Sequence, residues 1–348
     1  MAQAYPVRAS EHVNGGATGI GPVFDAPIAT AEYDGVATAP MSIVAPRRLG
    51  ETDLAVYPLA LGTAALARAA DTDAAQAVLD RYVHFGGNLI VTSQAHERGL
   101  GNAIVGGWMH RRDLRDHLFI DLRIGSGSES PGLGQINVVR SVESALMRLG
   151  TDHVDVLTLE GPDADVALAD TLATVEWLID TGKVRHIGFS GFSADSLLEA
   201  RVLSSSGLPK VALVEVPYSL MNRGDFERDL RIVTAAQSLG VLPTGPLAHG
   251  FLTGAYRSRS RLDAAARTAG VAGFLGRRGN RVLQVLDRVA ALHDSTMATV
   301  AVAWLLAKRG VVAPIVNVAS AVEVDDLMAA CSLRLSRSDM LELDRASE

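Results

Sequence analysis

From residue 45 onwards, two hydrophobic patterns alternate along the chain. Short apolar runs rich in Val, Ile and Leu, bounded by Gly or polar residues, are typical of buried parallel strands. Each run is followed by a longer segment whose apolar residues recur at helical spacing, as Ala75, Val78, Leu79 and Tyr82 do. This pattern predicts strands over 59–62, 88–92, 118–124, 154–159, 184–190, 211–216, 241–244 and 314–318. The predicted helices are 71–85, 101–110, 136–149, 165–181, 193–203, 226–239, 280–293, 296–309, 322–330 and 337–346.

The order of these elements predicts one α/β domain, a (β/α)8 TIM barrel over residues 45–348. A β-hairpin at 48–56 precedes the first barrel strand, and each of the eight predicted strands is followed by a helix. No G-x-G-x-x-G motif occurs at a strand–helix junction, which argues against a Rossmann domain. Because active sites of such barrels lie at the carboxyl ends of the strands, the residues that end each strand are the candidates for chemistry.

Residues 1–44 form an N-terminal extension that has neither helical nor strand periodicity. Its composition favours a flexible tail. The other interpretation is an arm that covers the pocket or packs on a neighbouring chain, which would make the protein a homo-oligomer or attach it to a partner protein. Val23, Phe24, Ile28 and Tyr33 are the candidate anchors of such an arm.

The composition narrows the class of partner. A formal charge of −7 and a pI near 5.7 offer no basic surface for nucleic acid or for an anionic membrane. We see no membrane-spanning run and no secretory signal, and the single cysteine, Cys331, fits the reducing cytoplasm. The nine histidines lack metal-ligand spacing, so we expect no metal site. The composition therefore favours a soluble, cytoplasmic protein.

Titratable side chains lie at the ends of three neighbouring predicted strands. His96 comes shortly after 88–92, Arg123 lies near the end of 118–124, and Glu160 follows 154–159. Histidine exchanges protons at a pKa of about 6.5, and a partly desolvated carboxylic acid titrates in the same range. Arginine can bind an oxyanion or a carboxylate. His96, Arg123 and Glu160 are therefore the predicted catalytic residues.

Seven segments, in order, resemble the aldo-keto reductase superfamily. They are RRLGETDL with LALGT; GGNLIVTS; VGGWMHRRD; SVESALMRLGTDHVDVLTLEGPD; GKVRHIGFSGFS; PYSLMNR; and GPLAHGFLTGAY. The resemblance runs from Arg47 almost to the C-terminus. It implies a (β/α)8 barrel of aldo-keto reductase type, sealed at its base by the N-terminal hairpin. It also implies, as the usual chemistry, hydride transfer from NADPH to a carbonyl.

The positions of the family's four catalytic residues hold other residues in this chain. Matching the family's D-T-A-x-x-Y-G to residues 91–97 puts Val91 at the aspartate and His96 at the tyrosine. Arg123 aligns with the lysine of F-I-A-T-K, and Glu160 aligns with the histidine of L-H-G-P-D. Four changes inside well-matched segments predict a divergent member that lacks the catalytic tetrad.

The cofactor positions are mixed. If a nucleotide binds, the resemblance assigns it Ser190, Glu215, Tyr218, Pro246, Leu247, Gly250, Leu252 and Asn317. Tyr218 matches the aromatic residue that stacks on nicotinamide, whereas Glu215 replaces a glutamine and Gly191 replaces an asparagine. The arginine that binds the 2′-phosphate aligns with Ala319. We therefore expect no cofactor, with weakened NADP(H) binding left open.

Three functions are compatible with these residues. The leading prediction is a repurposed, non-redox acid/base enzyme that dehydrates, cyclises, isomerises or decarboxylates a small carbonyl- or carboxylate-bearing metabolite in specialised biosynthesis. The second is a catalytically inactive scaffold or regulatory partner, in which Arg123 and Glu160 only form an ion pair. The third is an NAD(P)H-dependent carbonyl reductase with altered acid/base residues. Cofactor binding separates the third function from the other two.

Overall fold

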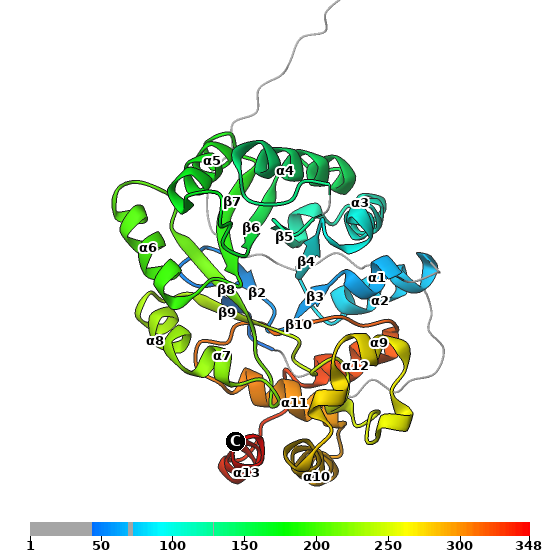
Figure 1. Ribbon diagram of the computed structural model, residues 1–348. Coiled ribbons are helices and arrows are strands. Elements are labelled where there is room, and N and C mark those ends of the chain that lie inside the picture. The colour runs from blue at the N-terminus through cyan, green and yellow to red at the C-terminus, as the bar shows by residue number, and fades with distance from the viewer. Residues whose placement is uncertain (1–43, 69–71, 128) are drawn as a thin grey trace, which may run out of the picture. The chain divides into compact units, whose positions relative to one another are not determined.

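Eight parallel strands form the wall of a barrel in the computed structural model (Figure 1), which describes residues 44–68, 72–127 and 129–348, without the side chain of His96. Their order is β10-β3-β4-β5-β6-β7-β8-β9, and every neighbouring pair is parallel. The strands are β3 (Ala60–Gly62), β4 (Leu89–Ser93), β5 (Phe119–Ile124), β6 (Val154–Glu160), β7 (Val184–Ser190), β8 (Val211–Pro217), β9 (Gly240–Thr244) and β10 (Ile315–Val316). Val241 N donates to Gly310 O (3.1 Å) and Val312 N to Val241 O (2.8 Å), which joins β9 to the segment before β10.

Helices surround this wall (Figure 1). The α-helices are α1 (Ala64–Arg68), α2 (Thr72–His84), α3 (Leu100–Arg112), α4 (Gln135–Leu149), α5 (Leu168–Asp180), α6 (Ala194–Ser205), α7 (Gly224–Glu227), α8 (Asp229–Ala236), α9 (Ala264–Thr268), α10 (Arg277–Leu292), α11 (Met297–Leu306), α12 (Ala321–Ala329) and α13 (Arg337–Ser347). The 3-10 helices are η1 (His96–Gly99), η2 (Arg115–His117), η3 (Phe251–Thr253), η4 (Arg259–Arg261) and η5 (Val271–Phe274). No single helix among the described residues is long and apolar enough to cross a membrane, although the bent pair α10 and α11, at 94°, passes by length and composition.

Two apolar clusters hold the barrel together. Successive residues of a strand point to opposite faces, so Ile90 packs outward against the helices while Val91 packs inside the barrel. The inner cluster also contains Leu49, Leu54 and Val56, which belong to the antiparallel hairpin of β1 (Arg47–Arg48) and β2 (Ala55–Val56) and to its turn. The hairpin therefore seals one end of the barrel. The carboxyl ends of the strands are where a barrel of this kind has its active site.

The predicted (β/α)8 barrel with its N-terminal hairpin is confirmed, and the differences are local. The predicted helix 226–239 is two helices, α7 and α8, because Arg228 between them has φ −89° and ψ −122°, outside the helical region. The predicted helix 165–181 begins only at Leu168. The predicted arm, residues 1–44, lies outside the described residues except for Val44, and its role stays a prediction.

Helix α13 begins with a capping box that gives a first prediction. The Ser336 hydroxyl accepts the Asp339 amide (3.1 Å), and the Asp339 carboxylate accepts the Ser336 amide (2.8 Å). Ser336→Ala leaves one of these amides without its partner, so we expect the free energy of unfolding to fall by about 1 kcal/mol in urea titrations. Ser336→Thr keeps the hydroxyl and should stay near the wild type; equal stability of the alanine variant would contradict the cap.

Candidate active site

The three predicted catalytic positions lie at the same end of the barrel. Arg123 is the next-to-last residue of β5, Glu160 is the final residue of β6, and His96 opens η1, shortly after β4. Since β4, β5 and β6 are neighbouring parallel strands, their carboxyl ends share one mouth. The structure thus brings these backbone positions together, whereas the His96 side chain lies outside the described part of the chain.

Arg123 is the centre of the site and contacts two carboxylates. Its Nη2 lies 2.7 Å from Glu160 Oε1, and its Nε lies 3.0 Å from Glu215 Oε2 on β8. The side chains of Arg123 and Glu160 are 22% and 14% exposed, whereas that of Glu215 is fully buried. The sequence predicts Glu215 only as a cofactor residue, and the structure adds it to the group around Arg123.

The loop after β5 supports Glu160. The Ser126 hydroxyl donates to Glu160 Oε2. Gly125 has φ +117°, and a Cβ there would lie 2.8 Å from the Glu160 carbonyl oxygen. Only glycine lets this loop come so close to the end of β6, so the sequence places Ser126 where it can hold the carboxylate.

Asp121 is a fourth charged side chain at the site, which the predicted site residues omit. It is fully buried, and its Oδ1 accepts a hydrogen bond from the Thr158 hydroxyl (2.7 Å). In register it pairs with Val91, the position that the resemblance matches to the family's aspartate. A carboxyl group therefore lies at the same height in the barrel as Val91, but on β5 instead of β4. The signal in the sequence is an acid inside the apolar strand FIDLRI, two residues before Arg123.

Burial dominates the electrostatics of this group. It raises the pKa of Asp121 well above its usual range, and the like charge of Glu215 adds to the effect. Burial, only partly offset by Arg123, raises the pKa of Glu215 to about 7. Burial opposes the charge of Arg123, but the surrounding carboxylates, Glu215 first, outweigh burial and raise the pKa of the guanidinium. The site therefore holds one permanent positive charge and carboxyl groups that take up protons.

The candidate cofactor residues occupy the other half of the same mouth. Ser190 ends β7, Glu215 lies in β8, Tyr218 follows β8, Pro246 and Leu247 follow β9, and Asn317 follows β10. Gly250 and Leu252 lie at the start of η3 and within it. Asn317 is exposed and accepts the Ala64 amide (3.1 Å). Tyr218 differs: it is 2% exposed, its ring packs on Phe226 and Trp304, and its hydroxyl donates to Glu227 (2.7 Å).

Two loops at the mouth have strained backbone. Among the described residues, seven other than glycine have positive φ, and three of these, Asp113, Ser238 and Asp294, are at helix ends, where that conformation is common. The remaining four form two consecutive pairs, Glu97–Arg98 after β4 and Ala248–His249 after β9. Such strain is typical of functional loops that the surrounding structure holds in place.

The mouth has features that fit a dinucleotide. Glu215 Oε1 and Oε2 are buried without a hydrogen bond of good geometry, so they can accept hydrogen bonds from an amide group of a ligand. Gly245 and Gly250, at φ +60° and +84°, let the backbone after β9 turn where a bulky residue would be strained. These features favour a bound ligand, although the ring of Tyr218 would have to become uncovered before it could stack on one.

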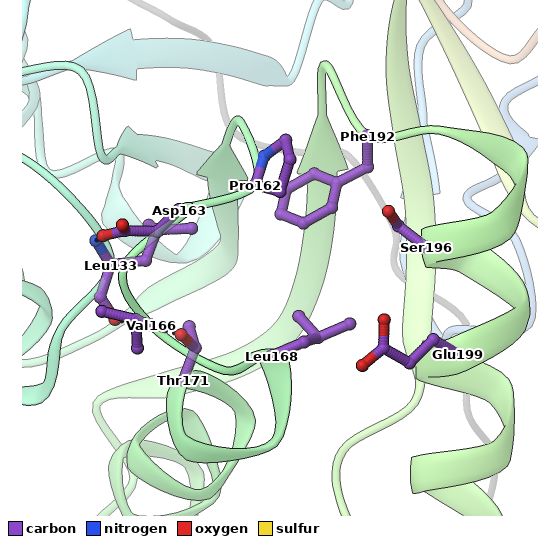
Figure 2. Close-up of a pocket in the computed structure, with 9 residues that line it drawn as sticks. All are labelled: Leu133, Pro162, Asp163, Val166, Leu168, Thr171, Phe192, Ser196 and Glu199. Atoms are coloured by element: carbon purple, nitrogen blue, oxygen red, sulfur yellow. Dashed lines mark hydrogen bonds between the residues drawn. The ribbon is translucent and has the colours of Figure 1, made fainter.

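A cavity of about 150 Å³ lies among residues that follow β5, β6 and β7 in the chain (Figure 2). It is lined by Leu133, Pro162, Asp163, Val166, Leu168, Thr171, Phe192, Ser196 and Glu199. One of its lining residues, Pro162, comes two residues after Glu160, but none of the three predicted catalytic residues lines the cavity. Binding sites for organic ligands usually measure about 300–1,000 Å³, so this cavity is small for a substrate. Within the described residues, no group of three or more His, Cys, Asp and Glu side chains could hold a metal ion.

Curated relatives cover most of the chain. An aryl-alcohol dehydrogenase of Pestalotiopsis microspora is 26% identical over 327 residues, which is 88% of this chain and 84% of the relative. Norsolorinic acid reductase B of Dothistroma septosporum is 25% identical over 320 residues, 86% of this chain and 81% of the relative. A probable voltage-gated potassium channel subunit beta of Oryza sativa subsp. japonica is 29% identical over 231 residues, 64% of this chain and 70% of the relative.

These relatives correct two predictions made from the sequence. The leading prediction of non-redox acid/base chemistry is wrong, because the relatives from Pestalotiopsis microspora and Dothistroma septosporum are named as a dehydrogenase and a reductase. The expectation of no cofactor is wrong for the same reason, since dehydrogenases and reductases of this family exchange hydride with a nicotinamide cofactor. Both predictions rest on four positions that the resemblance matches to the tetrad, whereas the framework around them matches reductases and dehydrogenases.

The family assignment itself rests on a match that spans most of the barrel. Residues 58–348 match the aldo/keto reductase family. That range contains all eight strands of the barrel wall and every predicted site residue. The chain therefore belongs to the aldo/keto reductase family.

Proposed function

We propose that the chain is a nicotinamide-dependent reductase that interconverts a carbonyl and an alcohol on a small molecule, with altered acid/base residues. The observation that carries the proposal is Arg123, a positive charge held at the barrel mouth between Glu160 and Glu215. A fixed charge in a partly dry site stabilises the negative charge that develops on a carbonyl oxygen as hydride adds to its carbon. The relatives named as dehydrogenase and reductase support this choice.

In this proposal each catalytic position has a separate role. Arg123 binds the carbonyl oxygen and Glu160 fixes the orientation of the guanidinium. Arginine keeps its proton at all physiological pH values, so the oxygen has to be protonated by another group. His96 is the proposed donor, because imidazole exchanges protons near neutral pH.

The hydride comes from a dihydronicotinamide when one is bound. The residues proposed to hold the cofactor are Ser190, Glu215, Tyr218, Pro246, Leu247, Gly250, Leu252 and Asn317. Their positions on β7 to β10 adjoin the catalytic positions on β4 to β6, which supports hydride transfer between the two halves of the mouth. Ala319 offers no side-chain contact to a 2′-phosphate, and we propose that NADP(H) binds weakly.

The substrate class that we propose is an aryl aldehyde or aryl ketone in specialised biosynthesis. The support is the name of the relative from Pestalotiopsis microspora, an aryl-alcohol dehydrogenase, together with the norsolorinic acid reductases. An aryl carbonyl conjugates with its ring, and the alkoxide formed from it is the charge that Arg123 would stabilise.

The first test of this function is cofactor binding, followed by turnover. We expect NADH and NADPH to bind the full chain with a measurable dissociation constant by calorimetry. We expect a panel of aryl aldehydes to be reduced, measured as loss of dihydronicotinamide absorbance. No binding at millimolar cofactor would overturn the proposal.

A scaffold is the second candidate, and a specific observation favours it. Arg123 and Glu160 do form an ion pair, and one relative is a potassium channel subunit. A scaffold without activity predicts that no aryl carbonyl is reduced even where cofactor binds. Turnover that disappears in a site variant and persists in a surface variant would reject it.

A further inference from the structure

Three carboxyl groups surround one guanidinium inside the barrel mouth. Asp121 and Arg123 come from β5, Glu160 from β6 and Glu215 from β8. Arg123 contacts Glu160 at 2.7 Å and Glu215 at 3.0 Å, while Asp121 and Glu215 are fully buried. With all three acids ionised, three negative charges would face one positive charge. A buried excess of charge is so costly that the group takes up protons instead.

The hydrogen bonds of this group are incomplete. Among the described residues, six buried side-chain nitrogen and oxygen atoms lack a hydrogen bond of good geometry. Four of the six belong here: Asp121 Oδ2, Arg123 Nε, and both carboxyl oxygens of Glu215. Arg123 Nε is near enough to Glu215 for attraction between charges, but the angle does not give a hydrogen bond. Glu215 is therefore not locked to Arg123 as Glu160 is.

We propose that Glu215 is a positioning residue for Arg123: with its proton it leaves the guanidinium free to bind a carbonyl oxygen, and without its proton it holds the guanidinium in the barrel. This inference rests on the proposed reductase function. Glu215 has no exposed surface, so it acts on the substrate oxygen only through Arg123. Because Glu215 is also among the residues proposed to hold the cofactor, its variants are measured at saturating cofactor.

The charges around Glu215 determine the direction of this effect. Arg123 and Asp121 face it from β5 and Glu160 from β6, with the Ser190 hydroxyl on β7 and the apolar Leu242 on β9. Burial, against the opposing pull of Arg123, raises the pKa of Glu215 from 4.5 to about 7. Below pH 7 Glu215 is neutral and Arg123 is balanced by Glu160. Above pH 7 a second negative charge competes with the substrate oxygen for Arg123, so activity should fall.

The proton on Glu215 can be measured without any activity. Because its pKa is raised in the folded state, the stability that it contributes is full below pH 4.5 and is lost as the pH rises through about 7. We compare urea unfolding of the full-length wild type and Glu215→Gln across this range. The ratio of their folding equilibrium constants should change by roughly 10²–10³-fold. Glu199→Gln, an exposed residue on α6, serves as control and should show no such change.

The positioning role is tested by the pH dependence of kcat/KM. His96, as the proposed proton donor, gives a falling limb of tenfold per pH unit by itself, and the ionisation of Glu215 should steepen the wild-type limb beyond tenfold per unit above about pH 7. Glu215→Gln should reduce the slope to the tenfold per unit of His96 alone, whatever its effect on the absolute rate, and Glu215→Asp should restore the steeper limb. Should Glu215→Gln not fold, infrared spectra of the wild type must show loss of protonated carboxyl signal as the pH rises through 7.

The outcomes separate the two proposals. A stability difference that does not depend on pH, or an infrared signal that stays constant, shows that Glu215 holds no proton and overturns the inference. A limb that is as steep in Glu215→Gln as in the wild type overturns the positioning role alone. If no carbonyl is reduced at any pH, the proposed function fails and the positioning role fails with it, although the unfolding data still identify the proton.

Discussion

Replacing Arg123 with glutamine is expected to lower kcat/KM for reduction of an aryl aldehyde by about 10²–10³-fold. Glutamine keeps hydrogen-bonding ability but removes the charge that we propose to bind the developing alkoxide. Steady-state rates at saturating cofactor measure the change, and binding of cofactor is measured separately by calorimetry. Because the substitution removes the charge that faces the buried Glu215, the Arg123→Gln variant is also checked for a native circular dichroism spectrum.

Two further variants give this result its meaning. Arg123→Lys keeps the charge but cannot contact two carboxylates in the same planar geometry, so we expect an intermediate rate. Arg309→Gln removes an exposed arginine between α11 and β10, at the amino end of the barrel, and should behave as wild type. A folded Arg123→Gln variant with full activity would exclude Arg123 from the mechanism.

The barrel could be predicted from the sequence because most of its elements have a clear local pattern. Leu89, Ile90 and Val91 put apolar side chains on both faces of β4, which is typical of a strand covered on both sides. Helix α1 could not be found in this way, since five residues are too short to show helical periodicity. The break between α7 and α8 at Arg228 could not be predicted for another reason. The residues around Arg228 have the same helical pattern as one continuous helix over 226–239.

The candidate site was predictable only in part. Arg123 and Glu160 were found because each is a charge at the end of an apolar strand. The contact between Arg123 and Glu215 joins β5 to β8 across the barrel, and such a contact depends on strand register and tilt, which cannot be read from the sequence. Asp121 is visible in the sequence as a neighbour of Arg123, but its burial is a property of the closed barrel.

The error about chemistry has a physical origin as well. The four positions that the resemblance matches to the tetrad would govern where a proton goes, whereas hydride transfer depends on a cofactor that we propose is held by the loops after β7 to β10. Changes at the proton-transfer positions therefore do not remove cofactor binding. The relatives of this chain are named for redox reactions. Arg123 is compatible with non-redox acid/base chemistry and with carbonyl reduction, since a positive charge at the mouth can assist any reaction that develops an oxyanion.

Asp155→Ala should destabilise the barrel by about 3 kcal/mol without changing the chemistry. Asp155 is 1% exposed near the start of β6, where its carboxylate accepts the Ile120 amide (2.9 Å) and contacts Arg115 (3.0 Å) and Arg185 (2.8 Å). Its removal leaves the Ile120 amide without its acceptor and takes one carboxylate from each arginine, while Arg185 keeps its contact with Asp53. Breaking a buried pair costs about 3–5 kcal/mol. The lower end applies because the arginine side chains stay 20% and 37% exposed.

Urea unfolding measures this loss of stability, and an exposed aspartate just before β6 serves as the control. Asp152 lies three residues earlier with a side chain that is 95% exposed, so Asp152→Ala should show no measurable change. Asp155→Asn keeps the shape and an acceptor but not the charge, and should fall between alanine and wild type. Because Asp155 is at the opposite end of β6 from Glu160, kcat/KM per folded molecule should be unchanged. A stable Asp155→Ala variant would mean that the apolar clusters alone set the alignment of β5, β6 and β7.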